Sequence, residues 1–183
     1  MEARNLVRIS KYLSKHLRHE PQRLGLQLEP SGWVSVDALL AACAADRFPI
    51  TRDELVEVVR NNDKQRFAFD PTQTRIRASQ GHSTPVDLQL EPAKPPAILY
   101  HGTPSRNVEV ILRNGLSKMA RHHVHLSATV ATAELVGKRR GRPVVLVVDA
   151  EAMDRDGFVF YCSANGVWLT DRVPPQYLSR LEE

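Results

Sequence analysis

Apolar residues recur at helical spacing near the start of the chain. They are Leu6, Ile9, Leu13 and Leu17. Because an α-helix completes one turn in about 3.6 residues, this spacing places all four side chains on one face. We therefore expect a helix over residues 4–17, with its apolar face turned toward a core.

Helix caps and alternating strands follow this first helix. Ser35 is suited to cap a helix that begins at Val36, and Thr51 with Glu54 has the spacing of a capping box. The stretches RFAFD and RIRAS flank the turn PTQT, which predicts two strands of a hairpin. Helices closed by a hairpin are typical of a winged helix, a module that binds nucleic acid or protein.

The composition changes between the two halves of the chain. Residues 81–95 are rich in proline and polar side chains, which predicts a linker between lobes at residues 1–80 and 96–183. The second lobe shows strands at AILYHGT, which ends in a glycine turn, and at HVHLS, VVLVVDA, FVFYC and GVWLT, and helices at SRNVEVILRNGL and TVATAELVGK. The apolar run VVLVVDA is expected to be buried on both faces. The fold class is therefore α+β.

The stretch RHHVHLS, residues 121–127, concentrates charge in a predicted strand. Side chains alternate between the two faces of a strand, so Val124 and Leu126 point toward a core together with His122. The other face then carries Arg121, His123, His125 and Ser127.

Zinc and a polar anion are both possible ligands for two imidazoles on this face. Arg121 disfavours zinc because it places a fixed positive charge beside the metal, and Cys43 and Cys162 are far apart, whereas structural zinc sites usually recruit paired cysteines. We therefore expect an anion or a polar ligand and no metal. A surface strand with solvated histidines remains the alternative.

Composition and charge limit the class of protein. With 183 residues and 42% hydrophobic content, the chain is long and apolar enough to form a core, which excludes wholesale disorder. Its net charge of +4 suits a polyanionic partner. Two lone cysteines, an N-terminus without the apolar core of a signal peptide and no membrane-length apolar run predict a soluble cytoplasmic protein.

Cations lie at the ends of predicted elements, where loops carry function. Arg18 and His19 follow the first helix, Lys64 and Arg66 precede the hairpin, and Arg121 precedes the strand HVHLS. A guanidinium donates paired hydrogen bonds to phosphate, so these arginines are candidate phosphate ligands. Solvated surface charges are the alternative for each of them taken alone.

A second group of candidates lies in the stretch YHGT. Gly102 after a strand would let a ligand approach the backbone closely, and Thr103 could hydrogen bond to that ligand. Trp168 is expected to pack in the core. The sequence contains no Walker loop, no GxGxxG and no recognisable Ser-His-Asp arrangement.

Taken together, these stretches resemble the RNA 2′-phosphotransferase family. The matching segments occur in family order over nearly the whole chain: SKHLRHEP, GWVSVDALL, NDKQRFAF, IRASQGHS, YHGT, RHHVHLS, VVLVVDA and NGVWLTDRVPPQYL. The resemblance implies an N-terminal winged-helix lobe that binds RNA and a C-terminal ADP-ribosyltransferase-like lobe that binds NAD. It also implies a monomer that acts on RNA bearing a 2′-phosphate, such as tRNA.

The resemblance assigns roles to particular residues. It implies a catalytic set of Arg18, His19, Arg66 and Arg121. It implies an NAD site formed by His101, Gly102, Thr103, His125 and Ser127. His122 matches a variable position and receives no role.

The implied reaction has two steps. The RNA 2′-phosphate displaces nicotinamide from NAD, which gives RNA-2′-phospho-ADP-ribose. The ribose 2″-hydroxyl then attacks phosphorus, which gives 2′-hydroxyl RNA and ADP-ribose 1″,2″-cyclic phosphate. Many ADP-ribosyltransferases carry a glutamate where this chain has NGVWLT, which has none. Its absence is intelligible, because a phosphate is already anionic and needs positioning more than deprotonation.

Two other functions remain open. One is a winged-helix regulator with a ligand-sensing second half, which would bind specific DNA without releasing nicotinamide. The other is an ADP-ribosyltransferase that modifies terminal phosphates of nucleic acids, which would leave a stable ADP-ribosylated product.

Overall fold

The computed structural model describes residues 3–61, 65–138 and 141–182 and divides the chain into two compact units. The N-terminal unit comprises residues 1–89 and the C-terminal unit residues 90–183. The division falls within the segment for which the composition predicts a linker. No described helix has the length and apolar character needed to cross a lipid bilayer.

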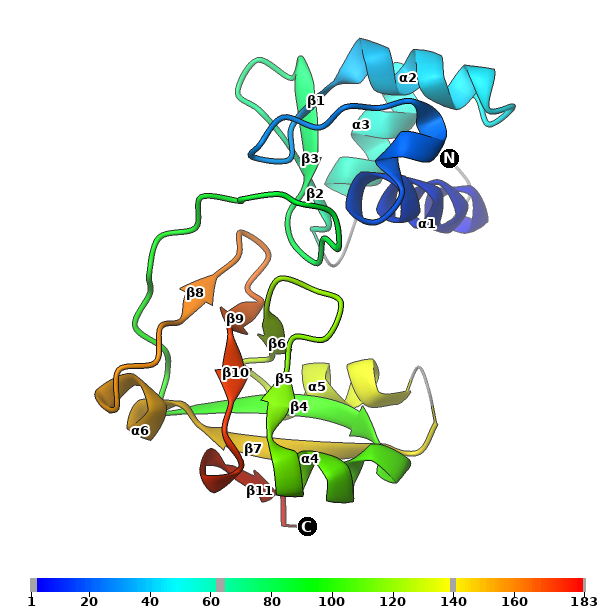
Figure 1. Ribbon diagram of the computed structural model, residues 1–183. Coiled ribbons are helices and arrows are strands. Elements are labelled where there is room, and N and C mark those ends of the chain that lie inside the picture. Colours follow the sequence, from blue (N-terminus) through cyan, green and yellow to red (C-terminus); the bar gives the residue numbers. More distant parts are fainter. Residues whose placement is uncertain (1–2, 62–64, 139–140, 183) are drawn as a thin grey trace. The chain divides into compact units, whose positions relative to one another are not determined.

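The N-terminal unit combines helices with one small antiparallel sheet (Figure 1). Its elements are α1 (Ala3–Arg18), η1 (Pro21–Leu24), β1 (Val34–Ser35), α2 (Val36–Ala45), α3 (Arg52–Arg60), β2 (Phe67–Phe69) and β3 (Arg75–Ala78). The strand order is β1-β3-β2, so β3 is the central strand and β2 and β3 form the predicted hairpin.

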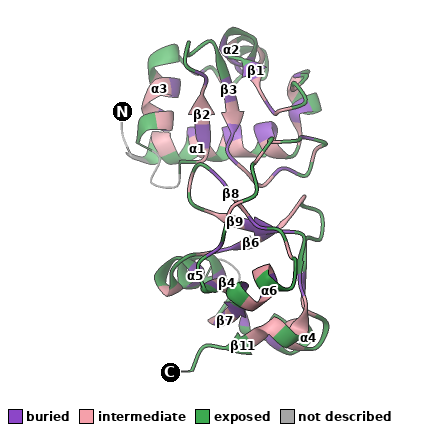
Figure 2. Cartoon of the chain, turned by 90° about the vertical axis from the view of Figure 1, so that its left-hand side faces the viewer, coloured by how far each residue is buried: buried purple, intermediate pink, exposed green. Residues whose placement is uncertain are grey.

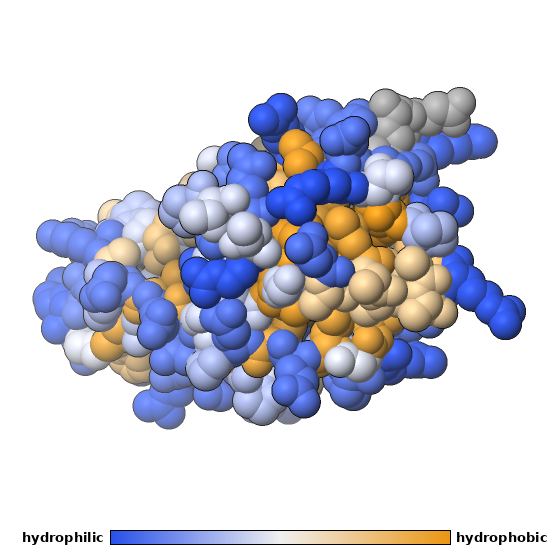
Figure 3. All heavy atoms as spheres, turned by 90° about the horizontal axis from the view of Figure 1, so that it is seen from above, coloured by the Kyte–Doolittle hydropathy of each residue, from blue (hydrophilic) through white to orange (hydrophobic). Residues whose placement is uncertain are grey.

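The local signals of this unit act as predicted. Leu13 and Leu17 of α1 are fully buried and Ile9 is almost so, in a core shared with α2, α3 and the sheet. The Ser35 side chain accepts a hydrogen bond from the backbone of Ala38, and Thr51 and Glu54 form the capping box. α2 departs from the usual amphipathic pattern: it exposes Ala38, Ala41, Ala44 and Ala45, and apolar side chains gather on the face seen from above (Figure 3).

The C-terminal unit is built from three small sheets with short helices. Its elements are β4 (Ile98–Pro104), η2 (Ser105–Asn107), α4 (Val108–Asn114), β5 (Leu116–Ser117), β6 (Val124–Leu126), α5 (Val130–Gly137), β7 (Pro143–Asp149), α6 (Ala150–Arg155), β8 (Tyr161–Cys162), β9 (Trp168–Thr170), β10 (Arg172–Val173), η4 (Pro175–Tyr177) and β11 (Leu178–Arg180). The strand orders are β11-β7-β4, β6-β9-β8 and β10-β5, and every pairing is antiparallel.

These helices and small antiparallel sheets confirm the α+β class. The run VVLVVDA forms most of β7, the central strand between β11 and β4. Val145 and Leu146 point to opposite faces of β7 and both are buried, as expected. A second core gathers side chains of β4, β6, β7 and α6, and Figure 2 shows buried residues along β6 and β9.

Two expectations for this unit need correction. Within FVFYC, only Tyr161–Cys162 forms a strand. Residues 158–160 are irregular, and the Phe160 side chain is buried in the core. The expected turn at Gly102 is absent, because β4 continues to Pro104. A Cβ added to Gly102 would lie 1.7 Å from the backbone oxygen of Ala133 in α5, so glycine here allows α5 to pack against β4.

The segment between the lobes is docked along much of its length. His82 and Val86 are buried in the N-terminal unit, and the Asp87 backbone donates to the Pro30 oxygen at 2.8 Å. In the C-terminal unit, the Ala93 backbone donates to the Phe160 oxygen at 2.8 Å. A segment with the composition of a linker therefore makes specific contacts with residues that are distant in the sequence.

Candidate functional site

The N-terminal unit brings together Arg18, His19 and Arg66. Arg18 is the last residue of α1, and Arg66 immediately precedes β2. The Arg18 Nη2 donates to the backbone oxygen of Arg66 at 3.4 Å. The Arg18 side chain is therefore held against the backbone at Arg66, 48 positions away in the sequence.

Ser79, just after β3, hydrogen bonds to the backbone at Gln65 and Arg66. Its backbone donates to the Arg66 oxygen at 2.9 Å, and its hydroxyl donates to the Gln65 oxygen at 2.8 Å. Gln65 has a φ of 39°, in the left-handed region that residues with a Cβ disfavour. The buried Ser79 thus stabilises the backbone conformation from which the Arg66 side chain extends.

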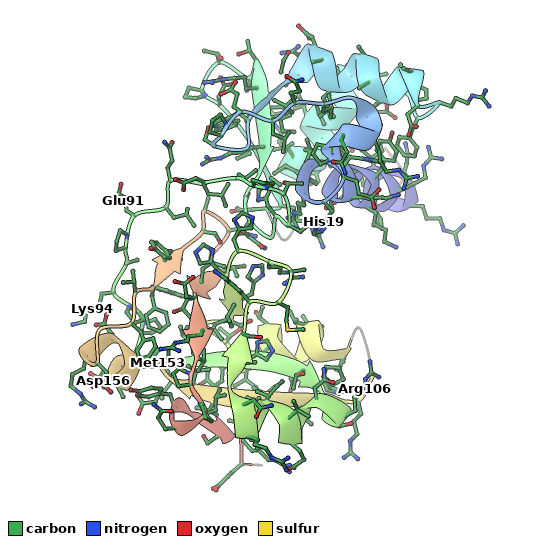
Figure 4. All side chains as sticks on the ribbon, in the orientation of Figure 1. His19, Glu91, Lys94, Arg106, Met153 and Asp156 are labelled. Carbon is green, nitrogen blue, oxygen red and sulfur yellow. The ribbon has the colours of Figure 1, made fainter. Side chains whose placement is uncertain are left out.

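Ser83 and Thr84 hold the C-terminal end of α1. The Ser83 backbone and the Thr84 hydroxyl both donate to the Arg18 oxygen, at 2.9 and 3.4 Å. The Ser83 hydroxyl also lies 2.9 Å from His19 Nδ1. His19 itself is exposed, and Figure 4 labels it. Sequence reasoning assigned no role to Ser79, Ser83 or Thr84, although the first two lie in the stretch IRASQGHS, which matched the family.

The C-terminal unit brings together Arg121, His125 and His101. Arg121 Nη1 lies 3.0 Å from His125 Nδ1, and His101 Nδ1 lies 3.2 Å from the His125 backbone oxygen. A guanidinium only donates hydrogen bonds, so His125 Nδ1 is the acceptor and its proton sits on Nε2. A carbonyl only accepts, so His101 carries its proton on Nδ1 and its Nε2 is an acceptor.

His101 is held in its neutral form. Burial lowers the pKa of His101 below its ordinary value of 6.5, and the Arg121 charge lowers it further, against the opposing effect of the hydrogen bond to the His125 carbonyl. Near neutral pH, the two imidazoles therefore differ in character: His101 Nε2 accepts a hydrogen bond, and His125 Nε2 donates one. A ligand with hydroxyl groups matches both.

The predicted alternation of RHHVHLS holds only within β6. Val124 and Leu126 are buried and His125 is partly exposed. Residues 121–123 form a bend, so Arg121 reaches His125 from a loop, not along a strand face. The His123 and Tyr161 rings pack in an edge-to-face arrangement with their centroids 5.5 Å apart, and burial lowers the pKa of His123.

Backbone pairing joins the two strands predicted to bind the cofactor. The Tyr100 backbone donates to the Ser127 oxygen at 2.9 Å, and the Ser127 backbone donates to the Tyr100 oxygen at 2.8 Å. This bridge places Ser127 beside His101. Thr103 lies farther along β4 and is buried, so its hydroxyl is not exposed to a ligand in this structure.

The predicted catalytic residues thus form two clusters, one in each unit. Arg18, His19 and Arg66 belong to the N-terminal unit, and Arg121 with the two histidines belongs to the C-terminal unit. Among the residues that the structure describes, no group of three or more His, Cys, Asp or Glu side chains could hold a metal ion. Lys64 lies outside the described residues. Trp168 packs against the second core, as expected.

Known proteins match this chain over almost its whole length. A family model described as "RNA 2'-phosphotransferase, Tpt1 / KptA family" matches residues 4–172. A "Probable RNA 2'-phosphotransferase" from Trichormus variabilis is 62% identical over 97% of this chain and 98% of that protein. Proteins of the same name from Nostoc punctiforme and Streptomyces coelicolor are 59% and 60% identical, over 99% and 97% of this chain and 100% and 97% of their own lengths. The chain therefore belongs to the RNA 2'-phosphotransferase, Tpt1 / KptA family.

Proposed function

We propose that this enzyme removes an internal 2′-phosphate from RNA by transferring it to NAD in two steps. The observation that carries the proposal is the hydrogen bond from the Arg18 guanidinium to the backbone oxygen of Arg66, which joins two residues that are predicted to bind the phosphate. Membership of the family supports the same reaction. The products are 2′-hydroxyl RNA, ADP-ribose 1″,2″-cyclic phosphate and nicotinamide.

Each unit has its own part in the proposal. The order α1-β1-α2-α3-β2-β3, with a three-stranded antiparallel sheet, supports a winged-helix lobe that binds RNA. The bridge between Tyr100 and Ser127 joins the two stretches, YHGT and HVHLS, to which the resemblance assigns NAD binding in an ADP-ribosyltransferase-like lobe. His101 Nε2 would accept from one hydroxyl of NAD and His125 Nε2 would donate to another, a pairing that suits ribose and needs no charged imidazole.

The first step joins a phosphate oxygen to the nicotinamide ribose carbon. The bond to nicotinamide breaks, and nicotinamide leaves as a neutral molecule with the electron pair of that bond. The phosphate is already anionic, so the protein needs no general base for this attack. Arg18 and Arg66 of the N-terminal unit would hold the phosphate in position by charged hydrogen bonds.

The second step is a transesterification at phosphorus. The ribose 2″-oxygen bonds to phosphorus, the bond from phosphorus to the RNA 2′-oxygen breaks, and a proton passes from the attacking hydroxyl to the leaving oxygen. Negative charge accumulates on the phosphoryl oxygens, so the arginines contribute most here. His19, which is exposed and follows Arg18 in the chain, would donate the proton to the leaving oxygen and recover one from the attacking hydroxyl.

A direct test incubates the protein with NAD and a 2′-phosphorylated oligonucleotide. The proposal expects loss of the 2′-phosphate together with release of nicotinamide in equal amount. Neither change would be seen if the protein were a regulator that only binds nucleic acid and a ligand. A stable ADP-ribosylated oligonucleotide as the sole end product would instead indicate an ADP-ribosyltransferase.

A further inference from the structure

Helix α1 carries an unusual concentration of positive charge. Its sixteen residues include five Lys or Arg and no Asp or Glu. Of the 25 Lys and Arg residues in the chain, this leaves 20 for all other positions, against 21 Asp and Glu. The net positive charge of the whole protein therefore originates in this one helix.

The five cations form a single stripe. They are Arg4, Arg8, Lys11, Lys15 and Arg18. At about 100° per residue, they lie within an arc of roughly 80°, opposite the face of α1 that enters the core. The first four are exposed, and Arg18 is partly buried. At about 1.5 Å per residue, the stripe extends roughly 21 Å along the surface of the N-terminal unit.

Among the residues that the structure describes, the acidic side chains that contact α1 do not neutralise the stripe. Glu20 pairs with Lys15 at 3.4 Å but also with Arg23 at 3.0 Å, at the C-terminal end of the helix. Glu54 accepts from Asn5 and belongs to the capping box of α3, and Asp46 accepts from Tyr12. Arg8 lies over the Phe48 ring at 4.9 Å, a contact that leaves its charge in place.

One end of the stripe is a residue of the candidate site. Arg18 closes the row and contacts Arg66. A polyanion that lies along α1 would therefore pass directly to the phosphate-binding cluster. We propose that the exposed face of α1, through Arg4, Arg8, Lys11 and Lys15, binds the phosphodiester backbone of the RNA next to its 2′-phosphate. This inference rests on the proposed function for the identity of the RNA.

A membrane surface suits this helix less well. Amphipathic helices that bind lipid insert their apolar face, and the apolar face of α1 is occupied by the core. Binding to the phosphate groups of a nucleic acid requires only the charged face of the helix. Such contacts release counterions, so they make affinity depend on salt concentration.

The test compares two triple variants and two substrates. The first variant is Arg4→Gln with Arg8→Gln and Lys11→Gln, which keeps helix propensity and leaves Arg18 intact. The matched control is Arg106→Gln with Arg113→Gln and Arg155→Gln, at exposed positions of the C-terminal unit (Arg106 is labelled in Figure 4). The substrates are a long 2′-phosphorylated oligonucleotide and a 2′-phosphorylated dinucleotide.

We expect the α1 variant to bind the long oligonucleotide more weakly. The slope of log affinity against log salt should fall by about 0.7 for each lost contact, so by about 2 in total. The control variant should keep the wild-type slope, and both variants should turn over the dinucleotide at the wild-type rate. Arg4→Lys with Arg8→Lys should also keep the slope, because point charges suffice for this kind of contact.

Three outcomes would overturn the inference. These are an unchanged slope in the α1 variant, an equal loss in the control variant, and equal binding of wild type to anionic lipid vesicles and to RNA. If circular dichroism shows that the triple variant is unfolded, the single Lys11→Glu variant decides by the same slope. Absence of turnover in wild type would reject the proposed function, whereas the binding slopes would still decide the role of α1.

Discussion

The guanidinium of Arg121 lies 3.0 Å from His125 Nδ1, and this contact determines which imidazole nitrogen carries the proton. Because arginine can only donate, His125 presents an Nε2–H to any ligand. An arginine of the predicted catalytic set therefore also sets the hydrogen-bonding character of the proposed NAD site.

Substitutions of His125 test this assignment. Glutamine places an amide near the position of Nε2 and keeps a donor there, whereas asparagine replaces only Nδ1. His125→Gln should therefore keep most of the affinity for NAD, and His125→Asn should raise the KM for NAD about tenfold, as expected for one lost hydrogen bond of about 1.4 kcal/mol. Steady-state kinetics with varied NAD measure this difference. Asparagine performing as well as glutamine would show that the Nε2–H has no ligand.

Lysine at Arg18 or at Arg66 should not replace arginine. Lysine keeps the charge but donates from a point and cannot form two parallel hydrogen bonds to one phosphate. We expect a fall in kcat of about a hundredfold or more for each variant, the usual effect of losing a donor that stabilises developing charge. Arg106→Lys serves as the control. Near-normal turnover in both site variants would mean that these side chains are ordinary surface charges.

Ser79 should behave as a positioning residue. Ser79→Ala removes the hydrogen bond to the Gln65 oxygen and should lower kcat about tenfold through the displacement of Arg66, at a cost of about 1 kcal/mol in stability. Ser35→Ala is the matched control, because it removes the cap of α2 at a similar cost in stability without contacting Arg66. Equal kcat values in these two variants would show that Ser79 acts on stability alone, and Ser79→Thr should restore turnover.

Stability should decrease in mild acid because of His101. Its pKa in the folded protein is below the ordinary 6.5, so the unfolded chain takes up the proton first as the pH falls. The contribution of neutral His101 to the stability of the folded protein is complete above pH 6.5. It is lost as the pH falls through the lowered pKa that His101 has in the folded state. The wild-type melting temperature should drop between about pH 7.5 and pH 5.5, and the drop should be smaller in His101→Asn. His123, whose pKa is also lowered, contributes in the same direction, so the dependence should decrease further in the double variant.

Most helices and strands were predicted from local sequence patterns. Features that depend on contacts between distant residues were not. The burial of Leu13 and Leu17 and the caps at Ser35 and Thr51 follow from neighbours a few residues away. α6 and β11 escaped prediction because each is too short for a periodic pattern to emerge.

The same limit applied to the candidate site. Arg18, Arg66 and Arg121 could be selected from the sequence as candidate phosphate ligands. The residues that hold them in position could not be selected in this way. Ser79 reaches back to Gln65 only in the folded hairpin. Gly102 suggested a close approach of a ligand, yet the group that approaches it is the backbone of α5. A glycine in the sequence suggests the close approach of another group, but the identity of that group is shown only by the folded structure.

The intermediate provides the most direct test of the proposed two-step reaction. The second step gathers negative charge around phosphorus, so loss of His19 or of Arg66 should slow it more than the first step. A mass-spectrometric time course of His19→Ala and Arg66→Ala, with excess NAD and a 2′-phosphorylated oligonucleotide, follows both steps at once. We predict that RNA-2′-phospho-ADP-ribose accumulates in these variants, while wild type proceeds to 2′-hydroxyl RNA. Slowed loss of substrate in both variants, with no intermediate at any time, would contradict this division of roles.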